Sequence, residues 1–382
     1  MSSERIYLDH AATTTARQEV VEAMLPYLTQ YGYNPSSLHR EGRKARAAVD
    51  AARETVARSL GARAKEIVFT GGGSEADNLA IVGVGRALGS RGKHVVTSTI
   101  EHQAVLHAVS VLEDEGWNVT VLDADRNGII DPLRFESALR PDTTLATIML
   151  ANNEIGTIQP IQRLAGIARK HAVVFHADAV QAPAHLPLDV SELGVDLLSI
   201  SAHKFYGPKG VGALYVRDGT PLVPLIVGGS QEFAKRAGTE NVAGIVAMAV
   251  AIEMAVGEFP HTPQRIQALR DRLESGIEQR IRDVRVNGKG GPRIANNCNV
   301  SFAAVDGEAL LIGLDLEGIA ISTGSACASG APEPSHVISA LGIAPKWTRA
   351  VVRFSLGRET TRAHIDRTLD VLVMVVSRLR GV

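Results

Sequence analysis

One lysine of this chain directly follows an apolar strand pattern. The segment 196–202, DLLSISA, runs into His203, Lys204 and a turn rich in glycine and proline. Open α/β sheets bind ligands at the carboxyl ends of their strands, and a poorly solvated lysine there binds its proton less tightly. A neutral amine at such a place can form a Schiff base with a carbonyl compound. Lys204 is therefore a candidate nucleophile, the alternative being an ordinary solvated loop lysine; Lys209, further along the turn, is the weaker candidate.

A glycine-rich turn at 70–78, TGGGSEADN, joins a second strand pattern to a helix pattern, with Ser74 as its expected N-cap. Free backbone N–H groups and the positive end of a helix together bind anions such as phosphate. The segment lacks the P-loop lysine and the GxGxxG spacing, which disfavours a nucleoside triphosphate or a dinucleotide. The alternative is a turn that needs glycine only for its backbone angles.

Three more polar side chains lie in or just after strand patterns. Asp178 ends the apolar segment 172–178, where a carboxylate needs a cation such as a protonated pyridine nitrogen, or else caps the next segment. His102 follows the strand pattern 94–99 and is the best acid–base candidate, a structural histidine being the alternative. Arg353, in VVRFSLGR, needs a carboxylate, which either a substrate or an internal acid could supply.

The two cysteines of the chain have different surroundings. Cys327 lies among small residues in GSACASGAPEPSH, 324–336, where we expect an exposed thiol that is free to move. Cys298, in NNCNVSF, has the apolar strand setting of a structural cysteine. Cys327 is therefore the candidate reactive thiol.

Composition limits the class of protein. With 382 residues, 45% of them hydrophobic, the chain can form one large domain and a smaller one. A formal net charge of −1 gives no general attraction to nucleic acid or anionic membrane, so a small molecule or a protein is the expected partner. The N-terminus lacks a secretion signal, and the longest apolar run, 242–252, is too short for a membrane span. We expect a cytoplasmic protein without a disulfide framework.

Alternating strand and helix patterns predict an α/β fold. The strand patterns lie at 66–70, 94–99, 118–123, 144–152, 172–178, 196–202 and 212–218. This alternation predicts a mostly parallel sheet between helices, with the last strand antiparallel because only a short turn precedes it. We assign 16–258 to this large domain and 259–382 to a smaller α+β domain, which the segment 1–15 joins. A site in the cleft between the domains would lie at the carboxyl edge of the sheet.

Together these segments resemble the NifS/IscS-type cysteine desulfurases, in the class V aminotransferase branch of the fold-type I pyridoxal phosphate enzymes. The resemblance covers nearly the whole chain. It rests on YLDHAATT (7–14), NPSSLHREGR (34–43), TGGGSEADN, EHQAVL (101–106), NNEIGTIQP (152–160), HADAVQ (176–181), SAHKFYGPKG (201–210), RAGTENVAGI (236–245), GSACASGAPEPSH and VRFSLGR (352–358).

The resemblance implies a pyridoxal 5'-phosphate site and a role for each matching residue. Lys204 would link to the cofactor, Asp178 would pair with its ring nitrogen, Gln181 would bind its phenolic oxygen and His102 would stack on its ring. Gly73, Ser74, Ser201 and His203 would hold the phosphate, and Thr239 would reach the phosphate of the other protomer of a homodimer. Asn153 and Arg353 would bind the substrate, with Asn153 also near the cofactor, and Cys327 would accept sulfur. No metal site is expected.

The implied reaction converts L-cysteine to L-alanine and leaves a persulfide on Cys327. The sulfur would pass to an iron–sulfur scaffold, a tRNA-thiolation protein or a nitrogenase-specific partner, and the sequence leaves this choice open. A selenocysteine lyase or another class V aminotransferase is the alternative, although the length of the loop after Cys327 favours a cysteine desulfurase. A noncatalytic interaction protein is the alternative from another class, and the complete set of Lys204, Asp178, His102 and Cys327 argues against it.

Overall fold

The computed structural model describes residues 5–323 and 334–381. Within them, the largest sheet has seven strands in the order β2-β8-β7-β6-β5-β3-β4. Their bounds are β2 Ile67–Thr70, β3 His94–Ser98, β4 Asn118–Leu122, β5 Thr143–Thr147, β6 Val174–Asp178, β7 Leu197–Ser201 and β8 Gly212–Val216. Neighbouring strands from β4 to β7 pair in parallel, whereas β8 is antiparallel to both β2 and β7. The expected mostly parallel sheet with an antiparallel last strand is confirmed.

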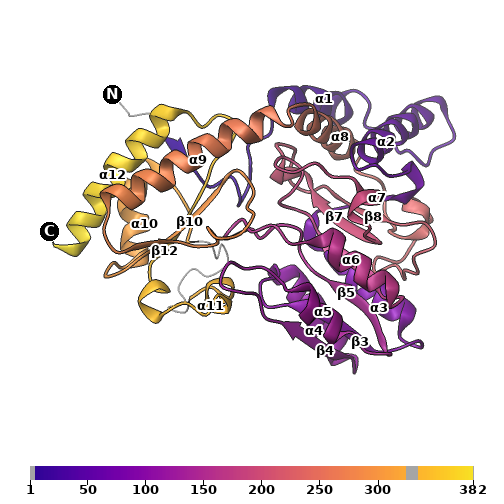
Figure 1. Ribbon diagram of the computed structural model, residues 1–382. Helices are drawn as coiled ribbons and strands as arrows, with labels where there is room; N and C mark the ends of the chain where they lie inside the picture. The colour runs from indigo at the N-terminus through magenta and orange to yellow at the C-terminus, as the bar shows by residue number, and fades with distance from the viewer. Residues whose placement is uncertain (1–4, 324–333, 382) are drawn as a thin grey trace.

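Helices cover both faces of this sheet (Figure 1). They are α1 Gln18–Thr29, α2 Arg40–Ser59, α3 Gly73–Leu88, α4 Gln103–Asp114, α5 Pro132–Ala138, α6 Ile161–Lys170, α7 Val190–Leu193 and α8 Val242–Gly257, with the short 3-10 helices η1 Ala64–Glu66, η2 Ala202–Lys204 and η3 Gln231–Ala234. Successive strand residues point to opposite faces, so Val95 packs with α3 and α4, while Val96 packs in the core that contains α2, α6 and α8. Strands buried on both faces explain the nearly continuous apolar runs of the sequence.

β5 ends earlier than its sequence pattern indicates. The apolar run extends to position 152, but the strand ends at Thr147. Asn152 forms a side-chain turn, because its Oδ1 accepts hydrogen bonds from the backbone N–H groups of Glu154 and Ile155, both at 2.9 Å. The segment 152–157 therefore leaves the sheet as a turn at its carboxyl edge.

The remaining chain forms a smaller α+β unit beside the sheet (Figure 1). β12 Val351–Ser355, β10 Asn297–Phe302 and β9 Val284–Val286 form an antiparallel sheet, and β1 Ile6–Tyr7 pairs in parallel with β11 Ile319–Ala320. The helices of this unit are α9 His261–Arg280, α10 Gly307–Leu316, α11 His336–Ala340, η4 Pro345–Trp347 and α12 Arg362–Arg380. Ile6 and Leu8 are buried in the same core as these elements.

Among the described residues, no single helix is long and apolar enough to cross a membrane. One pair, α8 and α9, passes the same test of length and composition together, but its helices are bent by 72°.

Candidate active site

Lys204 lies at the end of η2, just beyond the carboxyl end of β7. Its Nζ donates hydrogen bonds to the backbone oxygens of Ala11, at 2.6 Å, and Ala12, at 2.8 Å. Burial, aided by the nearby positive charge of Arg353, lowers the pKa of Lys204 to about 8, against the opposing effect of Asp178 and Asp9. Lys204 thus has a substantial neutral fraction near pH 8.

Lys209, by contrast, is fully on the surface in the turn that follows. Its sequence setting resembles that of Lys204, but it lies beyond the 3-10 helix and is solvated. This difference separates the two lysines by burial, which is the property that activates an amine.

Asp178 is the last residue of β6 and is 5% exposed. Its Oδ1 accepts a hydrogen bond of 2.9 Å from the backbone N–H of Val180. Burial raises the pKa of Asp178, and the nearby groups His102 and Lys204 oppose this shift. A buried carboxylate needs a cation or several hydrogen-bond donors beside it, and a cationic ring nitrogen would be a suitable partner for Asp178.

His102 is the N-cap of α4, and its Nδ1 accepts a hydrogen bond of 3.1 Å from the backbone N–H of Ala104. This contact assigns the proton of the neutral ring to Nε2. Burial lowers the pKa of His102, Asp178 raises it, and Lys204 lowers it further. The mutual influence of these three groups shows that the ends of β3, β6 and β7 bring them together.

The glycine-rich turn packs its backbone directly against the neighbouring strands. A Cβ added to Gly73 would lie 2.7 Å from Val180 Cγ2, and one added to Gly212 would lie 2.8 Å from the Cα of Gly72. The first backbone N–H groups of a helix have no acceptor within it, so this turn presents donors to an anion. A side chain at Gly73 would meet Val180, so the close packing of this turn requires glycine at that position.

The expected capping role of Ser74 is wrong. The N-cap of α3 is Gly72, which has φ 156°, and Ser74 is an exposed residue of the first helical turn. The positive φ of Gly72 favours glycine there, and α3 begins directly after it, before a serine could cap the helix.

Residues 11–14 lie against the site; the sequence analysis quotes them only within YLDHAATT and gives them no role in the site. Besides binding Lys204, the oxygen of Ala11 accepts a hydrogen bond of 3.0 Å from Gln181 Nε2. His203 Nδ1 lies 3.1 Å from Thr13 Oγ1, and burial together with Lys204 and Lys209 lowers the pKa of His203 to about 4. Ser201, buried at the end of β7, completes this edge. The only signal in the sequence was the run AATT at 11–14. Its contacts with Lys204 and Gln181 use backbone oxygens, which a search for side-chain motifs does not consider.

Arg353 on β12 is 1% exposed and joins the two domains. Its guanidinium donates to Asp9 Oδ1 at 2.8 Å and to the backbone oxygen of Asn153 at 2.9 Å. Within the described part of the chain, its buried Nε has no hydrogen-bond partner. The sequence left open whether a substrate or an internal acid supplies the carboxylate for Arg353. In the structure an internal acid, Asp9, pairs with it.

The other candidates lie elsewhere. Thr239 is exposed, in the segment between η3 and α8. Cys298 is fully buried on β10, and burial raises the pKa of its thiol well above the usual value, as befits a structural cysteine. Cys327 lies outside the described residues.

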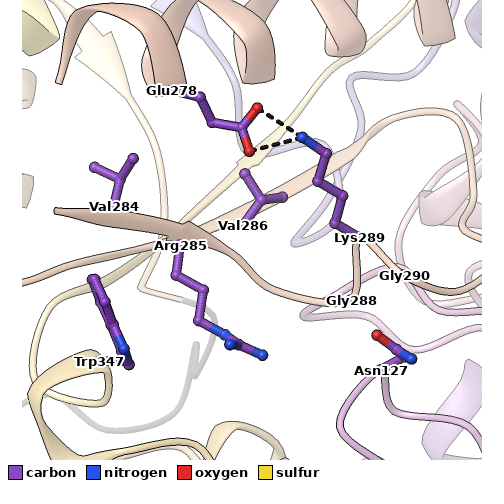
Figure 2. A pocket seen from close by; sticks show the side chains of 9 residues that line it. All are labelled: Asn127, Glu278, Val284, Arg285, Val286, Gly288, Lys289, Gly290 and Trp347. Carbon is purple, nitrogen blue, oxygen red and sulfur yellow. Dashed lines mark hydrogen bonds and ion pairs between the residues drawn. The ribbon is translucent and has the colours of Figure 1, made fainter. Parts of the chain in front are cut away.

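A groove of about 400 Å³ lies apart from this site, between the small domain and Asn127 of the large domain (Figure 2). Figure 2 shows Glu278 of α9 paired with Lys289, 2.7 Å apart, on one side of it and Arg285 and Trp347 on the other. The groove is lined by Asn127, Glu278, Val284, Arg285, Val286, Gly288, Lys289, Gly290 and Trp347. None of the candidate catalytic residues that the structure describes lines it, so it carries no argument about the reaction.

The chain matches the family model "Aminotransferase class-V" over residues 6–368. It is 53% identical to the cysteine desulfurase IscS of Dictyoglomus turgidum, over 99% of this chain and 96% of that protein. Among solved structures, a NifS-like protein superposes with a TM-score of 0.92 at 35% identity, covering 98% of this chain and 100% of the other. SspA in complex with cysteine gives a TM-score of 0.82 at 38% identity, covering 93% and 100%.

Proposed function

This chain belongs to the class V aminotransferase family and, within it, to the cysteine desulfurases, and we propose that its site works with pyridoxal 5'-phosphate and Cys327. One observation carries the proposal: Lys204 with a lowered pKa, the buried carboxylate of Asp178 and the imidazole of His102 lie together at one edge of the sheet. The test is direct: purified protein supplied with the cofactor and L-cysteine should form alanine and a protein persulfide in equal amounts in the first turnover.

The described residues fit the proposed cofactor. Lys204 would link to its aldehyde carbon, Asp178 would pair with its ring nitrogen and Gln181 would bind its phenolic oxygen. His102 would stack on its ring, and Asn153 would lie near it. The phosphate would be held by Gly73, Ser74, Ser201 and His203. When bound, pyridoxal phosphate supplies an aldehyde that condenses with amines and a ring that withdraws electrons from the substrate. The free backbone N–H groups at the start of α3 and the buried Asp178 support this fit independently.

The side chains of the protein then divide the remaining work. Arg353 would bind the substrate carboxylate beside Asn153, exchanging its bond to Asp9. Neutral Lys204 would take the α proton, and His102, with its proton on Nε2, would assist. Cys327, as a thiolate, would attack the substrate sulfur, so that a sulfur–sulfur bond forms as the carbon–sulfur bond breaks. The substrate carbon would then take up a proton to give alanine.

Cofactor uptake by the cofactor-free protein should depend on pH with a midpoint near 8. The reacting species is the neutral amine, and the pKa of Lys204 is lowered to about 8, so uptake should be nearly constant above this value and fall about tenfold per pH unit well below it. Stopped-flow absorbance at fixed cofactor concentration measures the rate. A midpoint near the ordinary lysine value of 10.5 would show that Lys204 is solvated.

We propose that the protein works as a homodimer in which Thr239 reaches the phosphate of the partner's cofactor. The exposed position of Thr239 is compatible with this role. Thr239→Ala should weaken cofactor binding about tenfold, the loss of roughly one hydrogen bond to a charged group.

Mixed dimers test whether Thr239 acts between subunits. In a dimer of one Lys204→Ala chain and one Thr239→Ala chain, one site would carry both changes and the other neither. The one site that keeps Lys204 should therefore bind the cofactor with wild-type affinity. Binding about tenfold weaker at that site, with dimer formation confirmed by light scattering, would place Thr239 in the site of its own chain and contradict the proposed arrangement.

We further propose that the sulfur passes in the cytoplasm to a protein acceptor, either an iron–sulfur scaffold or a tRNA-thiolation protein. Support comes from the similarity to desulfurases named IscS. Transfer of ³⁵S from the labelled enzyme to each purified acceptor distinguishes the two. Equal transfer to an unrelated thiol protein would argue against a dedicated acceptor.

A further inference from the structure

A side-chain hydrogen bond of Ser335 ties the start of α11 to the large domain. Ser335 is the N-cap of this helix, and its Oγ accepts a hydrogen bond of 3.1 Å from the backbone N–H of Val337. The same Oγ donates to Glu154 Oε2 at 2.6 Å. Ser335 therefore does two separate things: it caps a helix, and it binds a residue of the turn 152–157.

Glu154 is buried, 3% exposed, and the small domain binds it at further points. Its backbone oxygen accepts hydrogen bonds from Asn297 Nδ2, at 3.0 Å, and Asn299 Nδ2, at 3.1 Å, both on β10. Burial raises the pKa of the Glu154 carboxyl, against the bond from Ser335 and the charges of His336 and Arg353. Glu154 directly follows Asn153, whose backbone oxygen binds Arg353. It is thus a junction between the domains, next to the proposed substrate-binding residues.

A second contact holds the same end of α11. His336 Nε2 lies 2.9 Å from the backbone oxygen of Glu101, and its Nδ1 lies 3.3 Å from Gln103 Nε2. Glu101 and Gln103 are the two neighbours of His102. Val337 and Ile338 then pack in a buried cluster with large-domain residues, namely Ile100, Met149 and Ile155.

The other side of the segment 324–333 is also tied to the site. The backbone of Ser322 pairs with that of Arg353 through two hydrogen bonds, of 3.2 and 2.7 Å. The described residues on both sides of Cys327 are therefore held by groups that surround the proposed substrate: Arg353 on one side, and Glu154 with the neighbours of His102 on the other.

We propose that Glu154 and Ser335 are a positioning pair: their hydrogen bond fixes the start of α11 against the turn 152–157, and sulfur transfer to Cys327 depends on this contact. The inference rests on the proposed function, because it concerns transfer to Cys327. Neither residue is proposed to touch the substrate. Holding reacting groups in a fixed geometry contributes large factors in rate, and a displacement of about 1 Å can cost about 10²-fold.

Two substitutions of one residue separate the tether from the helix cap. Ser335→Asp keeps an acceptor for the N-cap but places a second carboxylate against Glu154, which breaks the tether. Ser335→Thr keeps both contacts. In full-length enzyme supplied with cofactor at pH 8, Ser335→Asp should lower kcat for alanine formation about tenfold with KM for cysteine within about twofold of wild type, and Ser335→Thr should retain wild-type rates.

The pH profile gives a signature that a merely structural role would not produce. Two facing carboxyl groups share a proton at lower pH, and the shared proton restores a hydrogen bond between positions 335 and 154. The ratio of wild-type to Ser335→Asp kcat should therefore shrink as the pH falls from 8 to 6. A constant ratio, or equal rates at pH 8, would overturn the proposal.

A readout without turnover separates this inference from the proposed function. In a Cys298→Ala background of the cofactor-free protein, Cys327 is the remaining thiol, and its rate of alkylation by iodoacetamide should rise at least about threefold with Ser335→Asp. Asp306→Ala, which removes the N-cap of α10 in the same domain, is the matched control and should leave the rate unchanged. If wild type forms no alanine, the proposed function fails; if alkylation responds equally to both variants, the tether fails.

Discussion

Lys204→Ala is expected to abolish alanine formation from L-cysteine, with a loss of about 10³-fold or more. The change removes both the covalent attachment of the cofactor and the amine proposed to move the α proton, and proton transfer alone contributes about 10²–10⁴-fold. The fold should persist, because Nζ contacts only two backbone oxygens, those of Ala11 and Ala12, in the described hydrogen bonds. Water can reach the space left by the truncated side chain and bind these oxygens.

The measurement combines activity with chemical trapping. Borohydride reduction of the cofactor-loaded wild type should fix the label on the peptide that contains Lys204, and the Lys204→Ala protein should retain no label after denaturation. Lys209→Ala is the matched control, because this lysine lies in the same turn but is exposed. It should keep both label and activity. A label on the Lys209 peptide, or full activity of Lys204→Ala, would exclude the mechanism.

Strand periodicity predicted the sheet well because its strands are buried on both faces. A run such as LLSIS in β7 has no polar alternation, and Leu197 and Leu198 enter opposite cores. The same property placed Asp178, and Lys204 shortly after β7, at the carboxyl edge, where a parallel sheet brings separate strand ends together. Candidate residues that end strands were thus located from local pattern alone.

Contacts between distant segments could not be read in this way. Asp9 pairs with Arg353 across most of the chain, and the oxygens of Ala11 and Ala12 bind Lys204 through backbone atoms that every residue possesses. Neither contact has a local signature. The start of α3 at Gly73 likewise depends on how closely Val180 approaches the turn, which is a property of tertiary packing. Long-range partners therefore required the folded structure.

The buried carboxylates beneath the site explain why one of them can carry the charge. Asp77, Glu101 and Asp178 influence one another, and burial raises the pKa of Glu101 to about 8 and that of Asp77 well above its usual value. At neutral pH most of Glu101 is therefore protonated. Asp178 alone has opposing groups in both His102 and Lys204, so it is the member of the set best able to remain ionised against a ring nitrogen.

Cys327→Ala is expected to bind cofactor and cysteine but to form alanine about 10³-fold more slowly than wild type, because no thiolate remains to take the sulfur. The absorbance change on adding L-cysteine should persist, while persulfide, detected by mass spectrometry of the intact chain, should be absent. This split between binding and transfer is what distinguishes the loss of a sulfur acceptor from the loss of the site.

The second cysteine supplies the control. Cys298→Ala removes a thiol that is fully buried on β10 and should cost about 1 kcal/mol of stability, seen as a fall of about 1 °C in Tm, without changing the rate. Since the chain has two cysteines, persulfide found in Cys298→Ala must lie on Cys327. Wild-type rates in Cys327→Ala would instead mean that sulfide leaves the substrate directly, as in a lyase, and would remove the protein-bound persulfide from the reaction.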